Sequence, residues 1–291
     1  MSVVAAIDVG TNSVRLLVAK VSQDKVEPLA REVQVTRLGQ GVDERRRLDS
    51  VAIDRTLSIL TKFTALIPQG APASIMATSA VRDAENGKEF AQLVKDRTGL
   101  TLQILSGLEE AELSFRGAAF SLQDAHLSDP ITVVDIGGGS TEIYTGTSYG
   151  ELLGGGSAQI GAVRLLERGR SDVVPILRPV VQKNLEFCPQ TLVAVGGTAT
   201  SLAAIIQGLQ TYNDEKVTGF SCSLDKLRKC SEKLGRLSLE ERRQIPSLQA
   251  GREDVIVYGA AILVQVVELM GFSKFYTTSG DLLYGSLMSL S

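Results

Sequence analysis

Two segments with the same pattern of apolar and polar positions lie in the two halves of the chain. Ala6-Ile7 leads into Asp8-Val9-Gly10-Thr11-Asn12-Ser13, and Val133-Val134 leads into Asp135-Ile136-Gly137-Gly138-Gly139-Ser140 at a constant offset. An apolar run that ends in Asp-x-Gly and then resumes is typical of a β-hairpin, whose tip is rich in backbone N–H groups. The sequence therefore predicts an internal duplication, with one hairpin opening each half.

Segments of helical and strand periodicity alternate after each hairpin. In the first half they predict helices over residues 51–66, 88–98 and 108–120, and strands over residues 73–78 and 102–105. In the second half they predict helices over residues 162–168, 173–188, 198–207, 224–234 and 254–270, and strands over residues 192–195 and 275–277. This alternation predicts an α/β fold class with two related domains around a cleft. The polar segment 123–130 places the boundary between a first domain, residues 1–125, and a second domain, residues 126–279.

Composition and charge argue against several kinds of binding partner. The chain has 291 residues, 44% of them hydrophobic, and a formal net charge of -3. Without a global basic field, we expect neither nucleic acid nor a membrane as a partner, and local donors must hold any anionic substrate. The N-terminus shows no signal-peptide pattern, which predicts a cytoplasmic protein. The apolar segment 255–270 is shorter than the roughly 20 residues that a membrane span needs, so we expect a buried helix there.

The scarcity of histidine narrows the possible chemistry. His126 is the only histidine, which excludes a histidine-based zinc site and a Ser-His-Asp triad. A general base must therefore be a carboxylate, with lysine or tyrosine much less favoured. The three cysteines, Cys188, Cys222 and Cys230, show no C-x-x-C spacing and fit a reducing compartment.

Three glycine-rich turns that end apolar strands form the candidate phosphate-binding set. Glycine lets the main chain approach a ligand closely and point several N–H groups at phosphate oxygens, and hydroxyl side chains add uncharged donors. Thr198 is also expected to cap the helix that follows it. One such turn alone is better explained as an ordinary tight turn, but two matched copies and a third favour a ligand site. The candidate residues are Gly10, Thr11, Asn12, Ser13, Gly137, Gly138, Gly139, Ser140, Thr141, Gly196, Gly197 and Thr198.

These turns resemble the phosphate motifs of the actin, sugar kinase and heat-shock chaperone superfamily, and more narrowly the exopolyphosphatase and guanosine pentaphosphate phosphohydrolase family. DIGGGSTE at residues 135–142 and ILSGLEEA at residues 104–111 carry the narrower resemblance. Further segments fit the family in order, at residues 77–86, 161–165, 251–256 and 280–285. The resemblance implies two duplicated ribonuclease-H-like (actin-like ATPase) domains, with residues 280–291 packing back on the first. It also implies a Mg²⁺ cofactor and allows a homodimer.

The resemblance also assigns roles to single residues. It implies that Glu110 is the catalytic base, that Asp135 and Glu142 belong to the metal and catalytic set, and that Arg82 contacts phosphate. From the pattern alone, Glu110 is better explained as an acid favoured in the first turn of a predicted helix. Asp8 and Asp135 occupy equivalent turn positions, where an aspartate can hold magnesium, cap its own turn, or do both.

Two features of the sequence bear on the substrate and on departures from the family. Arg164 and Arg252 are weaker phosphate-binding candidates, and the chain shows no dense basic stripe such as a long polyphosphate would need. Family members commonly carry Arg-Glu before the last glycine of residues 280–285, where this chain has Leu283-Tyr284.

The favoured interpretation is an exopolyphosphatase, which uses magnesium and water to release orthophosphate from the end of inorganic polyphosphate. A guanosine pentaphosphate 5'-phosphohydrolase would use the same phosphate-binding groups, so the sequence does not separate the two substrates. A kinase of the same superfamily and a non-catalytic sensor that binds an alarmone or polyphosphate are the alternatives from other classes. Glu110 as a water-directed base favours hydrolysis over both.

Overall fold

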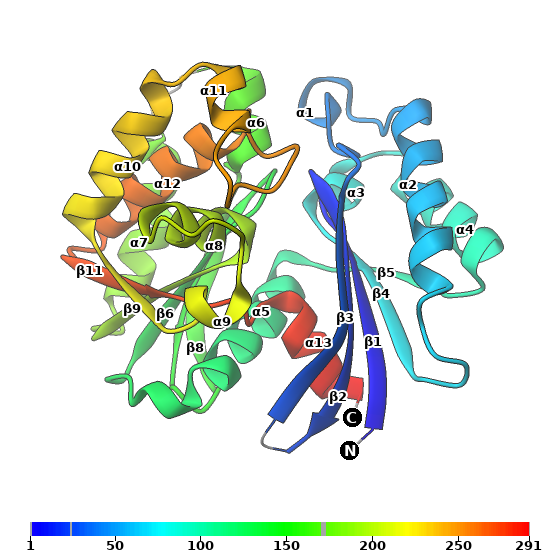
Figure 1. Cartoon of the computed structure of the whole chain (residues 1–291), viewed down its shortest axis with the longest axis horizontal. Helices are drawn as coiled ribbons and strands as arrows, with labels where there is room; N and C mark the ends of the chain where they lie inside the picture. Colours follow the sequence, from blue (N-terminus) through cyan, green and yellow to red (C-terminus); the bar gives the residue numbers. More distant parts are fainter. Residues whose placement is uncertain (1, 24, 170–172, 291) are drawn as a thin grey trace. The chain divides into compact units, whose positions relative to one another are not determined.

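The computed structural model describes residues 2–23, 25–169 and 173–290, and it divides into two compact units (Figure 1). Unit 1 comprises Met1–Leu113 and Leu282–Ser291, and unit 2 comprises Ser114–Asp281. The division falls within helix α5 (Gly107–Ser121), upstream of the polar segment 123–130. The domain limits inferred from that segment, residues 1–125 and 126–279, stay a prediction.

Unit 1 is built on a five-stranded sheet in the order β3-β2-β1-β4-β5. The strands are β1 (Ser2–Val9), β2 (Ser13–Ser22), β3 (Lys25–Val35), β4 (Ala73–Ala77) and β5 (Leu102–Ile104). Strands β1, β2 and β3 pair antiparallel, whereas β1, β4 and β5 pair parallel. The accompanying helices are α1 (Val42–Arg45), α2 (Ser50–Thr64), α3 (Ser79–Asp83), α4 (Gly87–Thr98), the start of α5, and α13 (Leu282–Leu290).

Strand β1 is buried on both faces, because helices cover the two sides of its sheet (Figure 1). Ala5 and Ile7 belong to a core shared with α2 and α4, whereas Val4 and Ala6 belong to a core shared with α13. A strand covered on both faces is apolar at successive positions, which explains the continuous apolar run 3–7. The C-terminal helix therefore completes the core of unit 1.

Unit 2 is built on a six-stranded sheet in the order β10-β11-β9-β6-β7-β8. The strands are β6 (Ile131–Ile136), β7 (Thr141–Gly146), β8 (Leu152–Ala158), β9 (Thr191–Val195), β10 (Phe220–Ser223) and β11 (Lys274–Thr277). Its helices are η1 (Gln123–Ala125), α6 (Ala162–Arg168), α7 (Val174–Leu185), α8 (Gly196–Ile206), α9 (Asp214–Val217), α10 (Leu224–Arg236), α11 (Leu239–Arg243) and α12 (Ile256–Leu269). Helices α7, α8, α10 and α12 share one core with β6, β7 and β9.

The two sheets repeat one topology, as the duplicated sequence predicts. The order β8-β7-β6-β9-β11 in unit 2 matches β3-β2-β1-β4-β5 in unit 1, with two antiparallel neighbours and two parallel ones in each. Strand β10 is an additional antiparallel edge strand on the second sheet. The predicted α/β fold class with two duplicated halves is confirmed.

The apolar segment near the C-terminus forms the buried helix α12. Ile262, Leu263, Val266 and Val267 are fully buried in the unit 2 core. Along the part of the chain that the structure describes, no helix is both long and apolar enough to cross a membrane.

The sequence pattern missed strands β3, β8 and β10, and the physical reasons differ for β3 and β8. Strand β3 lies at a sheet edge and contains Pro28 and several exposed residues, so neither face gives a clear apolar signal. Strand β8 contains Gly154, Gly155 and Gly156, which have low strand propensity. A Cβ on Gly154 would lie 2.7 Å from the Phe187 ring, so close packing against the second sheet accounts for glycine there.

Thiol labelling tests the core of unit 2. Burial raises the pKa of the Cys222 thiol to about 11 and that of Cys230 to about 11, while Cys188 is exposed. Because only the thiolate reacts and about one thiol in a thousand ionises three pH units below its pKa, we expect iodoacetamide at pH 8 to modify Cys188 first. Mass spectrometry of the folded and the urea-unfolded protein measures the order. Equal labelling of Cys188 and Cys222 in the folded protein would contradict this packing.

Candidate functional site

One edge of the unit 1 sheet gathers three chain segments that the sequence singled out. Strands β1, β4 and β5 are parallel, so their carboxyl ends lie at the same edge. The first glycine turn follows β1, helix α3 with Arg82 follows β4, and helix α5 with Glu110 in its first turn follows β5. The predicted strand ends therefore bring the first turn, Arg82 and Glu110 to one edge.

Hydrogen bonds hold the tip of the first hairpin. The backbone N–H of Gly10 donates to the Ser13 carbonyl at 3.0 Å, and the hydroxyls of Thr11 and Ser79 lie 3.0 Å apart. A Cβ on Gly10 would lie 3.0 Å from the Ser13 carbonyl oxygen, which is tighter than ordinary contact allows. Thr11 and Ser13 are buried. The tip is thus a defined structure attached to the segment after β4.

Asp8, at the end of β1, forms a buried ion pair with Arg15 of β2. Arg15 donates to Oδ2 of Asp8 from Nε at 2.9 Å and from Nη2 at 2.7 Å. The two residues are direct cross-strand partners, and Asp8 is 4% exposed. The sequence analysis gave Asp8 a possible metal ligand role and did not consider Arg15, whose charge balances the carboxylate.

Arg82 and Glu110 also form an ion pair. Nη1 of Arg82 donates to Oε2 of Glu110 at 2.9 Å and to the Leu105 carbonyl at 2.9 Å. Glu110 is 9% exposed, and Arg82 is half-buried. The Leu105 carbonyl anchors the guanidinium at the end of β5, so the Glu110 carboxylate is held at a defined position.

The neighbouring Glu109 has a structural explanation. Its carboxylate accepts a hydrogen bond from the Ser106 backbone N–H at 2.8 Å, and its own N–H donates to the Ser106 hydroxyl at 3.2 Å. This reciprocal pair is a capping box at the start of α5. The Ser106 backbone N–H, followed by its hydroxyl, lowers the pKa of the Glu109 carboxyl. Two adjacent glutamates in the same turn therefore have different surroundings.

The tip of the second hairpin packs against the start of α6. The backbone N–H groups of Ala162 and Val163 donate to the Gly137 and Gly138 carbonyls, each at 2.9 Å. A Cβ on Gly161 would collide with the backbone of Gly138 and Gly139. This close approach leaves no room for a side chain at position 161 and holds the second tip against the start of α6.

Two carboxylates lie side by side in the second hairpin. Asp135 of β6 and Glu142 of β7 are direct cross-strand partners, so their side chains project from the same face of the sheet. Ser114 donates to Oδ2 of Asp135 at 3.2 Å, and Ser157 donates to Oε1 of Glu142 at 2.7 Å. In the duplicated register, Glu142 occupies the position of Arg15. The first hairpin therefore pairs an acid with a base, and the second pairs two acids.

The third glycine turn leaves room for two charged groups. Gly196 has φ of 77°, a left-handed conformation that favours glycine. A Cβ on Gly196 would collide with the Asp135 carboxylate, and a Cβ on Gly197 would collide with the Arg252 guanidinium. Both charged groups therefore lie directly over this turn. Arg252, a weaker phosphate-binding candidate from the sequence, lies at this turn.

Two predicted hydroxyl donors are engaged with the main chain. Thr198 lies inside α8, which begins at Gly196, and its hydroxyl donates to the Ile136 carbonyl at 3.2 Å. The prediction that Thr198 caps the helix was wrong, because the helix starts two residues earlier. The Thr141 hydroxyl donates to the Ile160 carbonyl at 2.6 Å. Arg164 is buried and donates to the Gln159 side chain at 2.9 Å.

The carboxylates of the second hairpin fit a magnesium ion better than Asp8 does. Mg²⁺ takes oxygen ligands and is commonly bound by one or two carboxylates together with substrate phosphates. Asp135 and Glu142 supply two carboxylates, and glycine at position 196 keeps the space around Asp135 open. Among residues 2–23, 25–169 and 173–290, no three His, Cys, Asp or Glu side chains group to hold a metal. Substrate phosphate oxygens and water can supply the remaining ligands of such an ion.

The family motif at the C-terminus is replaced by core residues. Leu283 is 3% exposed and packs in the core that α13 shares with β1. Tyr284 lies with its ring centroid 5.7 Å from the Arg31 guanidinium carbon. The departure from Arg-Glu thus exchanges two charges for apolar packing and a cation–π contact.

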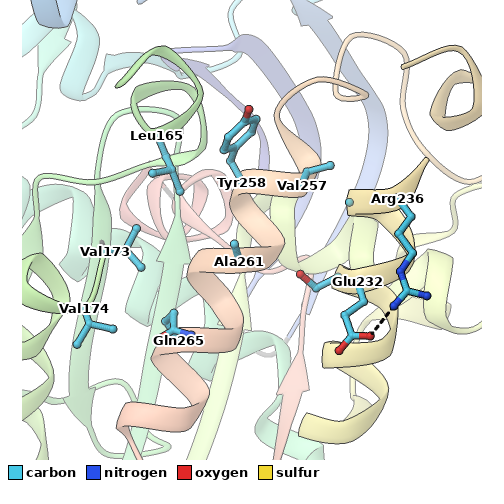
Figure 2. A pocket seen from close by; sticks show the side chains of 11 residues that line it. Leu165, Val173, Val174, Glu232, Arg236, Val257, Tyr258, Ala261 and Gln265 are labelled. Carbon is cyan, nitrogen blue, oxygen red and sulfur yellow. Dashed lines mark ion pairs between the residues drawn. The ribbon is translucent and has the colours of Figure 1, made fainter. Parts of the chain in front are cut away.

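A separate pocket of about 600 Å³ lies among helices of unit 2 (Figure 2). Its lining comes from α6, α7, α10 and α12 and includes Leu165, Tyr258 and Ala261. Glu232 and Arg236 form an exposed ion pair at its rim, at 3.6 Å. None of the predicted site residues lines this pocket, so its volume does not identify the phosphate site.

Comparison with known proteins agrees with these motifs. Residues 17–290 match the model of the Ppx/GppA phosphatase family. The chain is 35% identical to exopolyphosphatase 2 of Mycobacterium tuberculosis, over 99% of this chain and 98% of that protein. The crystal structure of the Aquifex aeolicus member of the Ppx/GppA family is 29% identical, with a TM-score of 0.80 and coverage of 99% and 97%. An exopolyphosphatase from Cytophaga hutchinsonii is 25% identical, with a TM-score of 0.88 and the same coverage.

The Asp8–Arg15 pair predicts a large stability effect. Replacing Arg15→Met leaves a buried carboxylate without its cation, which typically costs about 3 kcal/mol in the free energy of unfolding. The matched control is Lys229→Met, which removes a pair of similar length, 2.8 Å against 2.7 Å, whose partners are 75% and 69% exposed. We expect less than about 0.5 kcal/mol there. Urea denaturation measures the free energy of unfolding of both variants. Equal losses would show that burial of an ion pair does not change its contribution to stability.

Proposed function

Because this chain belongs to the Ppx/GppA phosphatase family, we propose that it is an exopolyphosphatase, which hydrolyses the terminal phosphoanhydride bond of inorganic polyphosphate. The observation that carries the proposal is the Arg82–Glu110 pair at the carboxyl edge of the first sheet. A carboxylate held by a phosphate-binding cation supplies the base that the chain's single histidine cannot readily supply. The naming of the Mycobacterium tuberculosis relative supports polyphosphate as the substrate.

In unit 1, Arg82 and the first hairpin tip are assigned to phosphate binding. The backbone N–H groups of Thr11 and Asn12 and the guanidinium of Arg82 suit phosphate oxygens. When a phosphate engages Arg82, the guanidinium exchanges part of its contact with Glu110 for contact with substrate. Glu110 is then available to accept the proton of a water molecule.

In unit 2, the second and third glycine turns and Arg252 are assigned to phosphate binding, and Asp135 and Glu142 to a magnesium ion. The ion, when bound, neutralises charge on the phosphate oxygens. Asp135 and Glu142 would hold it from adjacent strands, and Ser114 and Ser157 hold the two carboxylates through hydrogen bonds. The Asp8 carboxylate is assigned a structural role with Arg15 in preference to the metal role.

The reaction transfers one phosphoryl group to water. The water oxygen forms a bond to the terminal phosphorus, and the bond from that phosphorus to the bridging oxygen breaks. One proton of the water passes to the Glu110 carboxylate, and the bridging oxygen leaves with the shortened chain. The products are orthophosphate and a polyphosphate that is one unit shorter.

Replacing Glu110→Gln tests the base. We expect phosphate release from long-chain polyphosphate to fall by about 10²–10⁴-fold, with substrate binding retained, because glutamine cannot accept the proton. Glu109→Gln is the matched control from the same helical turn, and we expect turnover within about twofold of the native value because Glu109 only caps α5. Steady-state phosphate release and calorimetric binding measure the two properties.

Three outcomes would change the proposal. Equal turnover of native protein and Glu110→Gln would remove Glu110 as the base. If the native chain binds polyphosphate or guanosine pentaphosphate but releases phosphate from neither, it is a sensor. Faster release from guanosine pentaphosphate than from polyphosphate would assign the 5'-phosphohydrolase activity, which uses the same groups.

Replacing Asp135→Asn or Glu142→Gln tests the metal assignment. We expect the magnesium concentration for half-maximal phosphate release to rise at least about tenfold, because each variant removes one charged oxygen ligand. Glu151→Gln, which changes an exposed carboxylate just before β8, is the control and should leave the requirement unchanged. Titration with Mn²⁺ followed by electron paramagnetic resonance reads binding directly. An unchanged metal affinity in Asp135→Asn would reject the site.

A further inference from the structure

A segment with no role in the sequence analysis lies against the tip of the first hairpin. The backbone N–H groups of Thr36 and Arg37 both donate to the Asn12 carbonyl, at 3.0 Å and 2.9 Å. The backbone N–H of Gly39 donates to the Thr11 carbonyl at 2.9 Å. The segment 36–39 therefore lies directly beside the candidate phosphate-binding tip, within unit 1.

In segment 36–39, the residues on both sides of Arg37 are held in place by burial. Thr36 and Leu38 are fully buried, and Gly39 packs so closely that a Cβ there would lie 2.9 Å from the Ala80 side chain. Nε of Arg55 donates to the Thr36 carbonyl at 2.7 Å. Arg37 alone is half-buried between fully buried neighbours. Its position is therefore set by the packing of the residues around it.

Arg37 has an unfavourable backbone conformation for an arginine. Its φ is 50°, in the left-handed region that glycine adopts without a steric penalty. A side chain kept at such a position despite the penalty is a recognised feature of functional sites. Arg46 shares this conformation and is exposed, so what distinguishes Arg37 is its position between buried residues beside the tip.

Two buried polar atoms, one at the tip and one in segment 36–39, indicate a polar ligand. Nδ2 of Asn12 and the Thr36 hydroxyl are buried and have no hydrogen-bond partner within the described part of the chain. A buried donor costs free energy unless an acceptor satisfies it, and phosphate oxygens are strong acceptors. The tip and segment 36–39 thus combine buried hydrogen-bond donors with the adjacent Arg37 cation.

We propose that the Arg37 guanidinium contacts a phosphate of the substrate chain next to the phosphate held by the Gly10–Asn12 tip. The proposal rests on the proposed polyphosphate activity and names a further substrate-binding residue for it. A planar guanidinium binds phosphate oxygens bidentately and keeps its charge at every relevant pH. Arg37 would thereby supply one of the additional cations that a linear polyphosphate requires.

The replacement Arg37→Gly separates charge from backbone strain. Glycine keeps the left-handed backbone and the N–H groups, so the fold of the segment is preserved while the guanidinium is removed. Arg46→Gly is the matched control, because Arg46 is an exposed arginine with φ of 56° whose backbone carbonyl accepts from Glu85 at 2.8 Å. Both variants relieve the same kind of strain, and only one removes a residue beside the tip.

Three measurements are compared for native protein, Arg37→Gly and Arg46→Gly. Calorimetry with long-chain polyphosphate in magnesium-free buffer gives Kd, its repetition at several salt concentrations gives the salt dependence, and differential scanning gives Tm. For Arg37→Gly we expect Kd to rise about tenfold and the slope of log Kd against log salt to fall by about one, since one phosphate contact is lost. We expect kcat to stay within about twofold and Tm not to fall.

The outcomes distinguish this proposal from the one on which it rests. If Arg37→Gly binds polyphosphate as the native protein does, Arg37 is no substrate contact, while the exopolyphosphatase proposal stands. A lowered Tm with an unchanged salt slope would make Arg37 a structural residue and also overturn the proposal. A matching loss of affinity in Arg46→Gly would do the same. Native protein that neither binds polyphosphate nor releases phosphate from it would overturn both proposals.

Discussion

The parallel hydrogen-bond ladder is the constraint on which the candidate site depends. In each unit, the first strand of a hairpin pairs in parallel with a second strand and that strand pairs in parallel with a third, so the carboxyl ends of all three lie at one edge. Gly10, Arg82 and Glu110 are far apart in sequence and lie at this edge because each follows one of these strands. The second glycine turn and Gly196 meet in unit 2 for the same reason. Backbone pairing thus sets where the functional side chains lie. Only the identity of the side chain at each strand end varies.

The two hairpins show how one backbone supports two charge patterns. The first pairs Asp8 with Arg15, and the second pairs Asp135 with Glu142 at the same register. An acid with a base across a ladder stabilises a hairpin by itself, whereas two acids across a ladder repel and favour a cation between them. The duplication therefore has a structural copy and a copy suited to a metal, although the turn residues of the two are alike.

The sequence was sufficient for features that depend on local pattern, and insufficient for those that depend on distant contacts. The duplicated turns, the family and the place of Glu110 in the first turn of α5 were all predictable. Arg252 was not placed, because its guanidinium reaches Gly197 from a distant part of the chain. Strand β8 was hidden by glycines that make room for distant groups, Gly154 for the Phe187 ring and Gly155 for the backbone of β7. Thr198 was misassigned because the helix starts on the glycines themselves, where propensity argues against a helix.

The division of unit 1 between the two ends of the sequence has a consequence for synthesis. Val4 and Ala6 of β1 are covered by α13, which follows unit 2 in the chain, whereas unit 2 is one continuous stretch. During translation, unit 2 has all of its strands as soon as residue 277 has left the ribosome, but one face of the β1 sheet stays uncovered until residues 282–290 follow. Strand β1 is therefore made before unit 2 but covered only after it, and its open apolar face is the surface that a chaperone would have to shield on the nascent chain.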